Sequence, residues 1–543
     1  MSSLLEKNLQ AISIYNQELV QRICLPAGDS HIHVGEDEEV SFLVHGTPHH
    51  IRISDQELNS FEFPEITCPI FLMGLGLGEH LNAYVTHYKA PIQIIAWERD
   101  AWLMRLALSQ HDYSRPIQSG RLKFLMGIDL IDEIPNLENR FVVHHPFFKT
   151  CYYHDVVMAE AGLNPKRALI RSGGLFVDDL AETLRAKGYS VFLWDTHLLA
   201  PAEIQRTVEK FKPTILGSIN YARGLAEIAQ INQIPLLCWE IDPSIDKPRK
   251  LNAPHPNTSI FTYRRENVEE YQKAGFDSVS FLPLAANSDR RKPVELSEND
   301  RKLFGAKVSF VGASMVEQAS KYRHLFVELA KKFGFSDPTP KLEKILAEQR
   351  EDYSRLLLPE LLERHFPQLK NKIESNQEQT DPIQLLGEIS AAEKRFAYLA
   401  GLGEMGVHVW GDLYWKGIEK LGCKYRGAAK HFDELTKIYC ASKVNIDIGR
   451  IYQSGIITMR VFDVLSCGGC LLTEANQDIE TFFDVGQELD TYKTLDELRR
   501  KTLFYLQNPD KAKAMGERGR KRILQDHTIS LRIASMLESI QER

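Results

Sequence analysis

Short apolar runs alternate with helix-length amphipathic segments over most of this 543-residue chain. Apolar runs at residues 69–74 and 92–97 are each followed by a segment with helical spacing, and the alternation restarts at 167–171 and at 307–311. Strands separated by helices usually pair in parallel, because the chain crosses back over the sheet before the next strand begins. The pattern predicts an α/β protein with doubly wound, Rossmann-like domains.

The restarts also divide the chain into three domains. We expect an N-terminal Rossmann-like accessory domain at 1–160, a second at 161–300 and a third at 301–543. Residues 320–400 interrupt the third domain with charged, leucine-rich sequence of helical periodicity. Charge alternation such as Lys341-Leu342-Glu343-Lys344 is typical of solvated helix faces, so this segment is predicted to be a helical insertion.

Composition narrows the class of protein. With 43% hydrophobic and 26% charged residues, the chain has the balance of a soluble globular protein. A formal net charge of −7 disfavours a nucleic-acid or membrane-surface partner, since both present phosphates that attract basic faces. The first 19 residues lack a long apolar core, and the eight cysteines are scattered. We therefore expect a cytoplasmic protein with reduced thiols and no membrane span.

The most informative stretch is residues 443–474, which predicts a strand, a loop, a helix, a glycine turn and a second strand. Arg460 opens the helix, where a guanidinium beside free backbone N–H groups stabilises a pyrophosphate. Asp463 follows one turn later and is a candidate for contact with a ribose diol. Gly468 and Gly469 end the helix before the next buried strand.

Other residues of the third domain are candidates for contact with the same nucleotide ligand. Gly312 and Ser314 follow the strand at 307–311 and offer backbone N–H groups. Arg323 lies one helix further on and either contacts a diphosphate or forms a surface ion pair. Arg426 and Gly427 combine a cation with close backbone approach, which suits a nucleobase.

These motifs resemble the C-terminal domain of the spore-maturation (CgeB-like) glycosyltransferases, of the GT-B class. The resemblance covers about residues 306–543 and rests on Asn445, Arg450, Met459, Arg460, Phe462, Gly468, Gly469, Thr473 and the tail Asp526-His527-Thr528. Thr458 stands where that family usually has Ser, and Asp463 stands where it has Glu. The resemblance implies sugar transfer from a nucleotide-diphosphate sugar, with no cofactor required. It also implies that 161–300 is the acceptor-side domain and 301–543 the domain that binds the nucleotide-sugar donor. No D-x-D carboxylate pair is placed in the third domain, so we expect no metal requirement.

Glu240 and Asp242 end a buried apolar strand in the second domain. Ligands of doubly wound sheets bind at the carboxyl ends of strands. Either carboxylate is a candidate for the base that takes the acceptor hydroxyl's proton in an inverting reaction, and the alternative is a cap on the following turn.

A glycine-rich turn in the first domain suggests a second nucleotide site. Gly74, Gly76 and Gly78 follow the strand at 69–74, and Glu98 ends the next strand. This spacing is similar to that of methyltransferase-like nucleotide folds, in which the acid contacts the ribose. A tight turn that binds no cofactor has the same spacing.

The sequence favours a metal-independent GT-B glycosyltransferase with a nucleotide-sugar donor and an unidentified acceptor. One alternative is a methyltransferase-like enzyme that uses the site from Gly74 to Glu98. The other is a non-catalytic glycan- or protein-binding module with an inactive donor pocket. The sugar, the base, the stereochemistry and the oligomeric state stay open.

Overall fold

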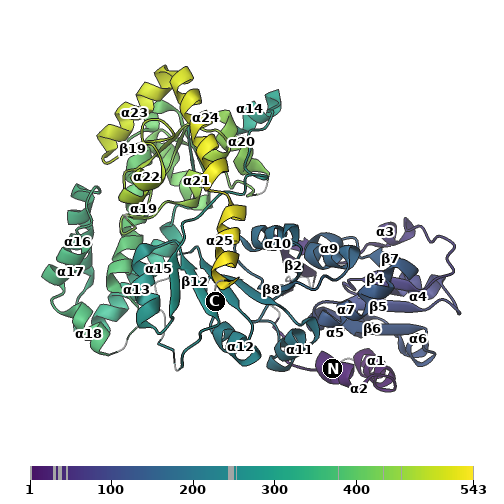
Figure 1. Cartoon of the computed structure of the whole chain (residues 1–543). Helices are drawn as coiled ribbons and strands as arrows, with labels where there is room; N and C mark the ends of the chain where they lie inside the picture. Colours follow the sequence, from purple (N-terminus) through teal and green to yellow (C-terminus); the bar gives the residue numbers. More distant parts are fainter. Residues whose placement is uncertain are drawn as a thin grey trace. The chain divides into compact units, whose positions relative to one another are not determined.

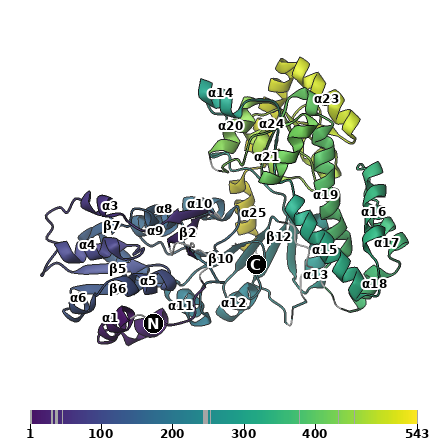
Figure 2. The same cartoon turned by 180° about the vertical axis from the view of Figure 1, so that it is seen from behind.

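The computed structural model describes residues 3–28, 32–34, 39–44, 47–242, 250–251, 253–376, 378, 380–431, 433–453 and 455–541. Two compact units divide the chain, Met1–Leu237 and Cys238–Arg543. Parallel strands alternate with helices in both units (Figures 1 and 2). The predicted α/β class with parallel sheets is confirmed.

The first unit begins with helices α1 (Ser3–Ser13) and α2 (Gln17–Ile23), followed by a small antiparallel sheet of β1 (Ile32–Val34), β2 (Val40–Val44) and β3 (Thr47–His50). A parallel sheet follows in the order β6-β5-β4-β7, from β4 (Ile70–Met73), β5 (Ile94–Glu98), β6 (Leu122–Met126) and β7 (Phe141–His144). Its helices are α3 (Asp55–Asn59), α4 (Glu79–His87), α5 (Ala101–Gln110), α6 (Ser114–Gln118), α7 (Leu130–Glu133), α8 (Phe148–Cys151) and α9 (Tyr153–Ala161). Apolar side chains of α1 and α2 share one core with this sheet.

A second parallel arrangement in this unit contains β8 (Arg167–Arg171), which pairs with β9 (Ser190–Trp194) and β10 (Ile215–Ile219). Its helices are α10 (Val177–Ala186), α11 (Pro201–Phe211) and α12 (Leu225–Asn232). Strand β11 (Leu236–Glu240) contains the division between the two units. These elements agree with the α/β alternation expected from residue 167 onward.

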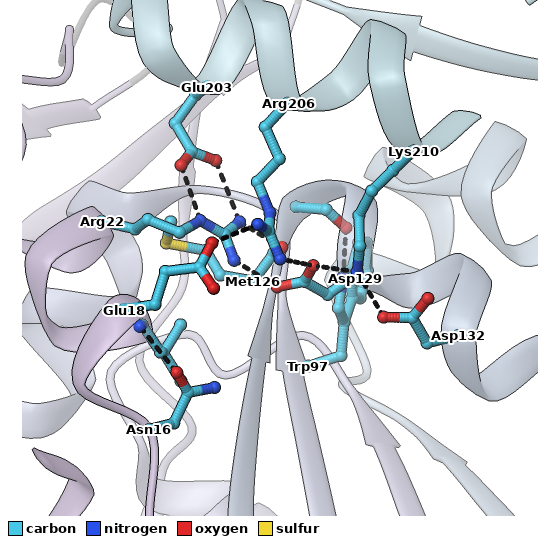
Figure 3. A network of polar contacts seen from close by, with 12 residues as sticks. Asn16, Glu18, Arg22, Trp97, Met126, Asp129, Asp132, Glu203, Arg206 and Lys210 are labelled. Carbon is cyan, nitrogen blue, oxygen red and sulfur yellow. Dashed lines mark hydrogen bonds and ion pairs between the residues drawn. The ribbon is translucent and has the colours of Figure 1, made fainter. Parts of the chain in front are cut away.

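A charge network whose central residues Arg22, Asp129 and Glu203 are buried joins α2, the turn at 127–129 and α11 within this unit (Figure 3). We use the name charge network for Glu18, Arg22, Asp129, Asp132, Glu203, Arg206 and Lys210. Arg22 binds Glu203, with its Nε 2.6 Å from Oε1, and also Asp129. Asp129 in addition accepts from Arg206 at 2.9 Å and from Lys210 at 2.7 Å. Helix α2, the turn after β6 and α11 are therefore tied together by ion pairs.

The second unit continues with a parallel pair of β12 (Thr258–Thr262) and β13 (Ser278–Phe281), together with α13 (Arg265–Lys273) and α14 (Glu298–Phe304). A parallel sheet follows in the order β16-β15-β14-β17-β18-β19. Its strands are β14 (Ala306–Val311), β15 (Val407–Trp410), β16 (Lys424–Tyr425), β17 (Ser442–Ile446), β18 (Leu471–Glu474) and β19 (Asp490–Tyr492). Its remaining helices are α20 (Glu434–Ala441), α21 (Met459–Ser466), α22 (Gln477–Phe482), α23 (Leu495–Gln507), α24 (Pro509–Asp526) and α25 (Ile529–Gln541).

The predicted helical insertion lies between β14 and β15. It comprises α15 (Val316–Lys332), α16 (Thr339–Glu351), α17 (Leu358–His365), α18 (Leu369–Ser375) and α19 (Pro382–Ala400). These helices bury their own apolar core, and α15 packs along α19 (Figures 1 and 2). The insertion is confirmed as helical and begins slightly earlier than residue 320.

The chain's last helices return to the segment before α14. Backbone bonds join Ala286 N to His527 O at 3.1 Å and Ile529 N to Ala286 O at 3.0 Å. The ring of His527 lies among those of Phe462, Phe482 and Phe483. Packing among these rings accounts for His527 of the Asp526-His527-Thr528 tail.

Candidate functional site

The carboxyl ends of β14, β15 and β17 meet at one edge of the last sheet, and the predicted donor residues Gly312 and Ser314 lie there. Ser314 is hydrogen-bonded to Asp412, whose carboxylate accepts from the Ser314 backbone N at 2.6 Å and from the Ser314 Oγ at 2.7 Å. A Cβ on Gly312 would lie 2.6 Å from Nη2 of Arg460. Glycine at 312 therefore leaves room for a guanidinium under the turn.

Arg460 links two strand ends at this edge. Its Nε donates to Val311 O at 2.6 Å, its Nη1 binds Asp447, and its guanidinium lies 4.9 Å from the ring centre of Phe310. Asp447 is buried and also accepts from Thr473 Oγ1 at 2.9 Å. Arg460 thus holds the first turn of α21 against the end of β14, and its predicted phosphate contact stays a prediction.

Asp463, the predicted ribose contact, pairs with Arg291. Arg291 Nε lies 3.2 Å from Asp463 Oδ2, and the two side chains are only 2% and 7% exposed. The carboxylate is therefore committed to a buried structural pair in this structure, which disfavours the ribose role. Sequence patterns could not reveal a partner 172 positions earlier.

The remaining predicted donor contacts divide between surface and packing positions. Arg323 forms ion pairs with Glu343 and Glu393, which is the alternative that the sequence left open. Arg426 donates to the backbone carbonyl of Leu303, while Gly427 has a positive φ of 90° with open space around its Cα. The nucleobase role of Arg426 and Gly427 remains a prediction.

Gly468 and Gly469 end α21, and α24 packs closely against them. Gly468 has a φ of 73°, and Gly469 N donates to Val464 O at 3.0 Å. A Cβ on Gly516 of α24 would lie 2.1 Å from Gly468 O, so the backbones touch. Helix termination and close packing explain these glycines without a ligand.

Two further arginines reach the same edge from segments that sequence reasoning did not single out as cation sources. Arg395, on α19, is 7% exposed and donates from Nη1 to Ala313 O at 2.6 Å. Arg450, in the loop after β17, donates to Glu388 of α19 at 3.1 Å. We call Arg395, Arg450 and Arg460 the arginine cluster. Burial, with Arg460 and Arg450 nearby, lowers the pKa of Arg395 to about 9.

The two carboxylates predicted as bases differ. Glu240 is buried and accepts from Thr262, from Asn267 at 2.9 Å and from Tyr271 at 3.3 Å. Burial raises the pKa of Glu240, although these hydrogen bonds oppose the shift. Asp242 is exposed and acts electrostatically on Tyr263, on which Arg450 acts as well. Asp242 is therefore the more accessible of the two candidate bases, while Glu240 braces β11, β12 and α13. Residues 243–249 lie outside the described residues.

The glycine-rich turn of the first unit is filled by the protein's own side chains. A Cβ on Gly74 would lie 2.9 Å from Phe148, one on Gly76 2.5 Å from His145, and one on Gly78 2.9 Å from the Tyr113 hydroxyl. This close packing favours the tight turn that binds no cofactor.

Glu98 is likewise turned inward. It is fully buried and accepts from Leu75 N at 2.7 Å, from Asp100 N at 3.2 Å and from the Tyr152 hydroxyl. Burial raises the pKa of Glu98 to about 7 against these hydrogen bonds. The predicted ribose contact would require this carboxylate to give up its present partners.

Among the described residues, no group of three or more His, Cys, Asp or Glu side chains is arranged to hold a metal ion. Nor does any helix in this part of the chain combine the length and apolarity needed to cross a bilayer.

One region of the chain matches a known protein family. Residues 391–538 match a family model described as glycosyl transferase-like. The chain thus contains a glycosyl transferase-like region, which includes Arg395, Arg450, Arg460 and the strands from β15 to β19. No curated protein matches the chain.

Several solved structures resemble the chain distantly. A sucrose-phosphate synthase from Thermosynechococcus elongatus is 10% identical, with 69% of this chain and 98% of that chain covered and a TM-score of 0.43. A glycosyltransferase from Rickettsia africae is 10% identical, covers 70% and 98%, and has a TM-score of 0.42. Anabaena HepE in complex with UDP-glucose is 11% identical, covers 69% and 100%, and has a TM-score of 0.39. These distant similarities assign no substrate to this chain.

Proposed function

We propose that the protein is a GT-B glycosyltransferase of the spore-maturation (CgeB-like) kind, which transfers a sugar from a nucleotide-diphosphate sugar to an acceptor. The observation that carries the proposal is the position of Arg460, which lies in the glycosyl transferase-like region and holds the first turn of α21 against the end of β14. A helix N-terminus beside a glycine turn at the carboxyl edge of a parallel sheet favours binding of a diphosphate. The domain division at about residues 160 and 300 belongs to this proposal.

The arrangement supports leaving-group stabilisation by fixed protein charges. Backbone N–H groups at the start of α21 and nearby guanidinium groups offset the charge that develops on the departing nucleoside diphosphate. The acceptor hydroxyl then loses its proton to a carboxylate, for which we propose Asp242. We propose no metal or other cofactor for the reaction.

A panel of ligands tests the proposal on the full chain. Thermal unfolding is measured with UDP-, GDP-, dTDP- and CMP-sugars and with S-adenosylmethionine, followed by assays of sugar-nucleotide hydrolysis. We expect one diphosphate sugar to raise the midpoint and to be turned over. Stabilisation by S-adenosylmethionine alone would favour the methyltransferase-like alternative. Binding of glycans without turnover of any sugar nucleotide would favour the non-catalytic module.

Two experiments examine the chemistry once a donor is found. EDTA should leave turnover largely intact, and complete loss that Mn²⁺ restores would contradict the metal-independent mechanism. Asp242→Asn should lower kcat by about 10²- to 10⁴-fold with little change in donor affinity, as expected for loss of a general base. Unchanged kcat in Asp242→Asn would assign the proton transfer to another group.

A further inference from the structure

Arg395 is a buried cation that forms no ion pair within the described part of the chain. The side chain is 7% exposed, and its Nη1 donates to Ala313 O at 2.6 Å. Its Nε is buried and has no hydrogen-bond partner among the described residues. Within the same residues, no acidic side chain lies at ion-pair distance from this guanidinium.

The acids nearby are already matched by other arginines. Asp447 pairs with Arg460, and Glu388 pairs with Arg450 at 3.1 Å. Three guanidinium groups thus share two carboxylates, which leaves one surplus positive charge at this edge. Arg395 and Arg460 also lie beside the same Phe310 ring, at 5.9 and 4.9 Å from its centre.

The neighbouring cation on α19 provides a contrast. Lys394 is 3% exposed, and its Nζ lies 2.7 Å from Oε1 of Glu474. Both consecutive residues are buried, yet among the described residues the lysine has an acidic partner at ion-pair distance and the arginine does not. Because an uncompensated buried charge is costly, proteins usually pair such charges or keep them for a ligand.

The position of Arg395 indicates which ligand would supply the missing charge. Its bond to Ala313 O places the guanidinium at the turn after β14, where parallel sheets bind ligands. A guanidinium with free N–H donors matches the geometry of a phosphate group. We propose that Arg395 binds a phosphate of the nucleotide-diphosphate donor, whose negative charge completes the arginine cluster.

This inference rests on the proposed function and names one residue and one group of the donor. The anion is a phosphate ester or pyrophosphate, so UDP, inorganic pyrophosphate and uridine serve as probes. If the phosphate is the group recognised, UDP and pyrophosphate should raise the unfolding midpoint of the native chain while uridine should have a much smaller effect. Equal stabilisation by uridine and UDP would overturn the inference.

The deciding experiment compares Arg395→Gln with Arg350→Gln. Arg350, in the same helical insertion, is 45% exposed and pairs with Glu393 at 2.9 Å. Arg395→Gln should weaken UDP binding by about 10- to 100-fold, because a hydrogen bond between charged partners is lost. Arg350→Gln should bind UDP as the native protein does.

Stability without ligand separates binding from a structural role. Since the described residues give Arg395 no ion pair to lose, Arg395→Gln should unfold at the native temperature or above it. A lower midpoint combined with native UDP affinity would show a structural arginine and would overturn the inference.

A conservative variant covers the case in which Arg395→Gln does not fold. Arg395→Lys keeps the charge but loses the planar fork, so UDP affinity should fall about 10-fold. Native affinity in Arg395→Lys would also count against the inference while leaving the proposed function standing. If the native protein bound no nucleoside diphosphate of any base, the proposed function itself would fail.

Discussion

The charge network of the first unit and the arginine cluster of the second both bury arginines, but they differ in how the charges are matched. In the network, Arg22 binds two carboxylates and Asp129 accepts from three cations. In the cluster, the polar partner of Arg395 among the described residues is a backbone carbonyl, that of Ala313. Figure 3 shows the matched case, in which cations and acids face one another from α2, the 127–129 turn and α11.

The pKa values express the same difference. Although burial alone would raise it, Arg22 and Lys210 hold the pKa of Asp129 at about 2. Burial and the neighbouring arginines act in one direction on Arg395 and lower its pKa to about 9. Asp447 and Glu388 oppose the shift of Arg395 only in part. The network therefore pairs its buried charges within the fold, whereas Arg395 would gain a directly bonded counter-charge from a bound anion.

The largest expected loss of stability comes from removing the central carboxylate of the charge network. Asp129→Asn should destabilise the first unit by roughly 3 to 5 kcal/mol, because buried cations lose their shared acid. Asp132→Asn is the control: Asp132 is 54% exposed and its ion pair among the described residues is with Lys210, so the loss should stay below about 1 kcal/mol. Urea unfolding followed by circular dichroism measures both. Equal losses in the two variants would mean that burial does not determine how much each ion pair of the network contributes to stability.

A matched arginine of the cluster should behave unlike Arg395. Arg460→Met leaves Asp447 buried with Thr473 as its remaining side-chain donor, and it should cost roughly 2 to 4 kcal/mol of stability. Thermal unfolding without ligand compares Arg460→Met with Arg395→Met, for which no loss is expected. If the two variants unfolded at the same temperature, the distinction between matched and unmatched arginines would be wrong.

The filled glycine turn offers a third test that separates the units. Gly76 has a φ of 57°, and a Cβ there would lie 2.5 Å from His145 Nε2, so Gly76→Ala should cost roughly 1 to 3 kcal/mol. Gly120→Ala, at φ 72° with open space around it, should cost only about 1 kcal/mol. Calorimetry measures the loss, and UDP affinity should be unchanged in both. A loss of UDP binding in Gly76→Ala alone would revive a nucleotide site at this turn.

The smallest effect concerns acid. Burial, with Arg532 nearby, lowers the pKa of His527 to about 4. Because the unfolded histidine takes up a proton near pH 6.5, stability from this residue is present above pH 6.5 and is lost as the pH falls toward 4. The loss at pH 5.5 should be about 1 kcal/mol, while Asp129, with its pKa near 2, keeps the charge network ionised.

His527→Gln tests this assignment. The variant's stability should change less between pH 7 and 5.5 than that of the native protein, whatever its stability at pH 7. An identical pH dependence in both proteins would mean that other groups cause the acid loss.

Local sequence patterns predicted the strands well because strands and turns are set by neighbouring residues. The run 167–171 became β8, and Gly468 with Gly469 ended α21 as expected. Partners distant in sequence were out of reach. Nothing around Gly76 indicates that His145 fills the space above it, and nothing around Asp463 points to Arg291.

Arg395 was missed because its helix was interpreted as a solvated insertion. A signal was nevertheless present: Glu388 and Arg395 lie seven residues apart, on the same stripe of α19 as buried Leu385, Ala392 and Leu399. Charged residues at apolar positions of an amphipathic helix are rarely solvated. Such positions mark groups that meet a buried partner or a ligand.

The packing of Ile451 limits how far the chain can be shortened. Its side chain belongs to the apolar core of the helical insertion, while Arg450 and Tyr452 on either side both bind Glu388 of α19. The loop after β17 is therefore anchored in the helices as much as in the sheet. A shortened chain without α16–α18 would lose part of the apolar core that holds this loop. A fragment used to screen for nucleotide-sugar binding should therefore retain the whole insertion.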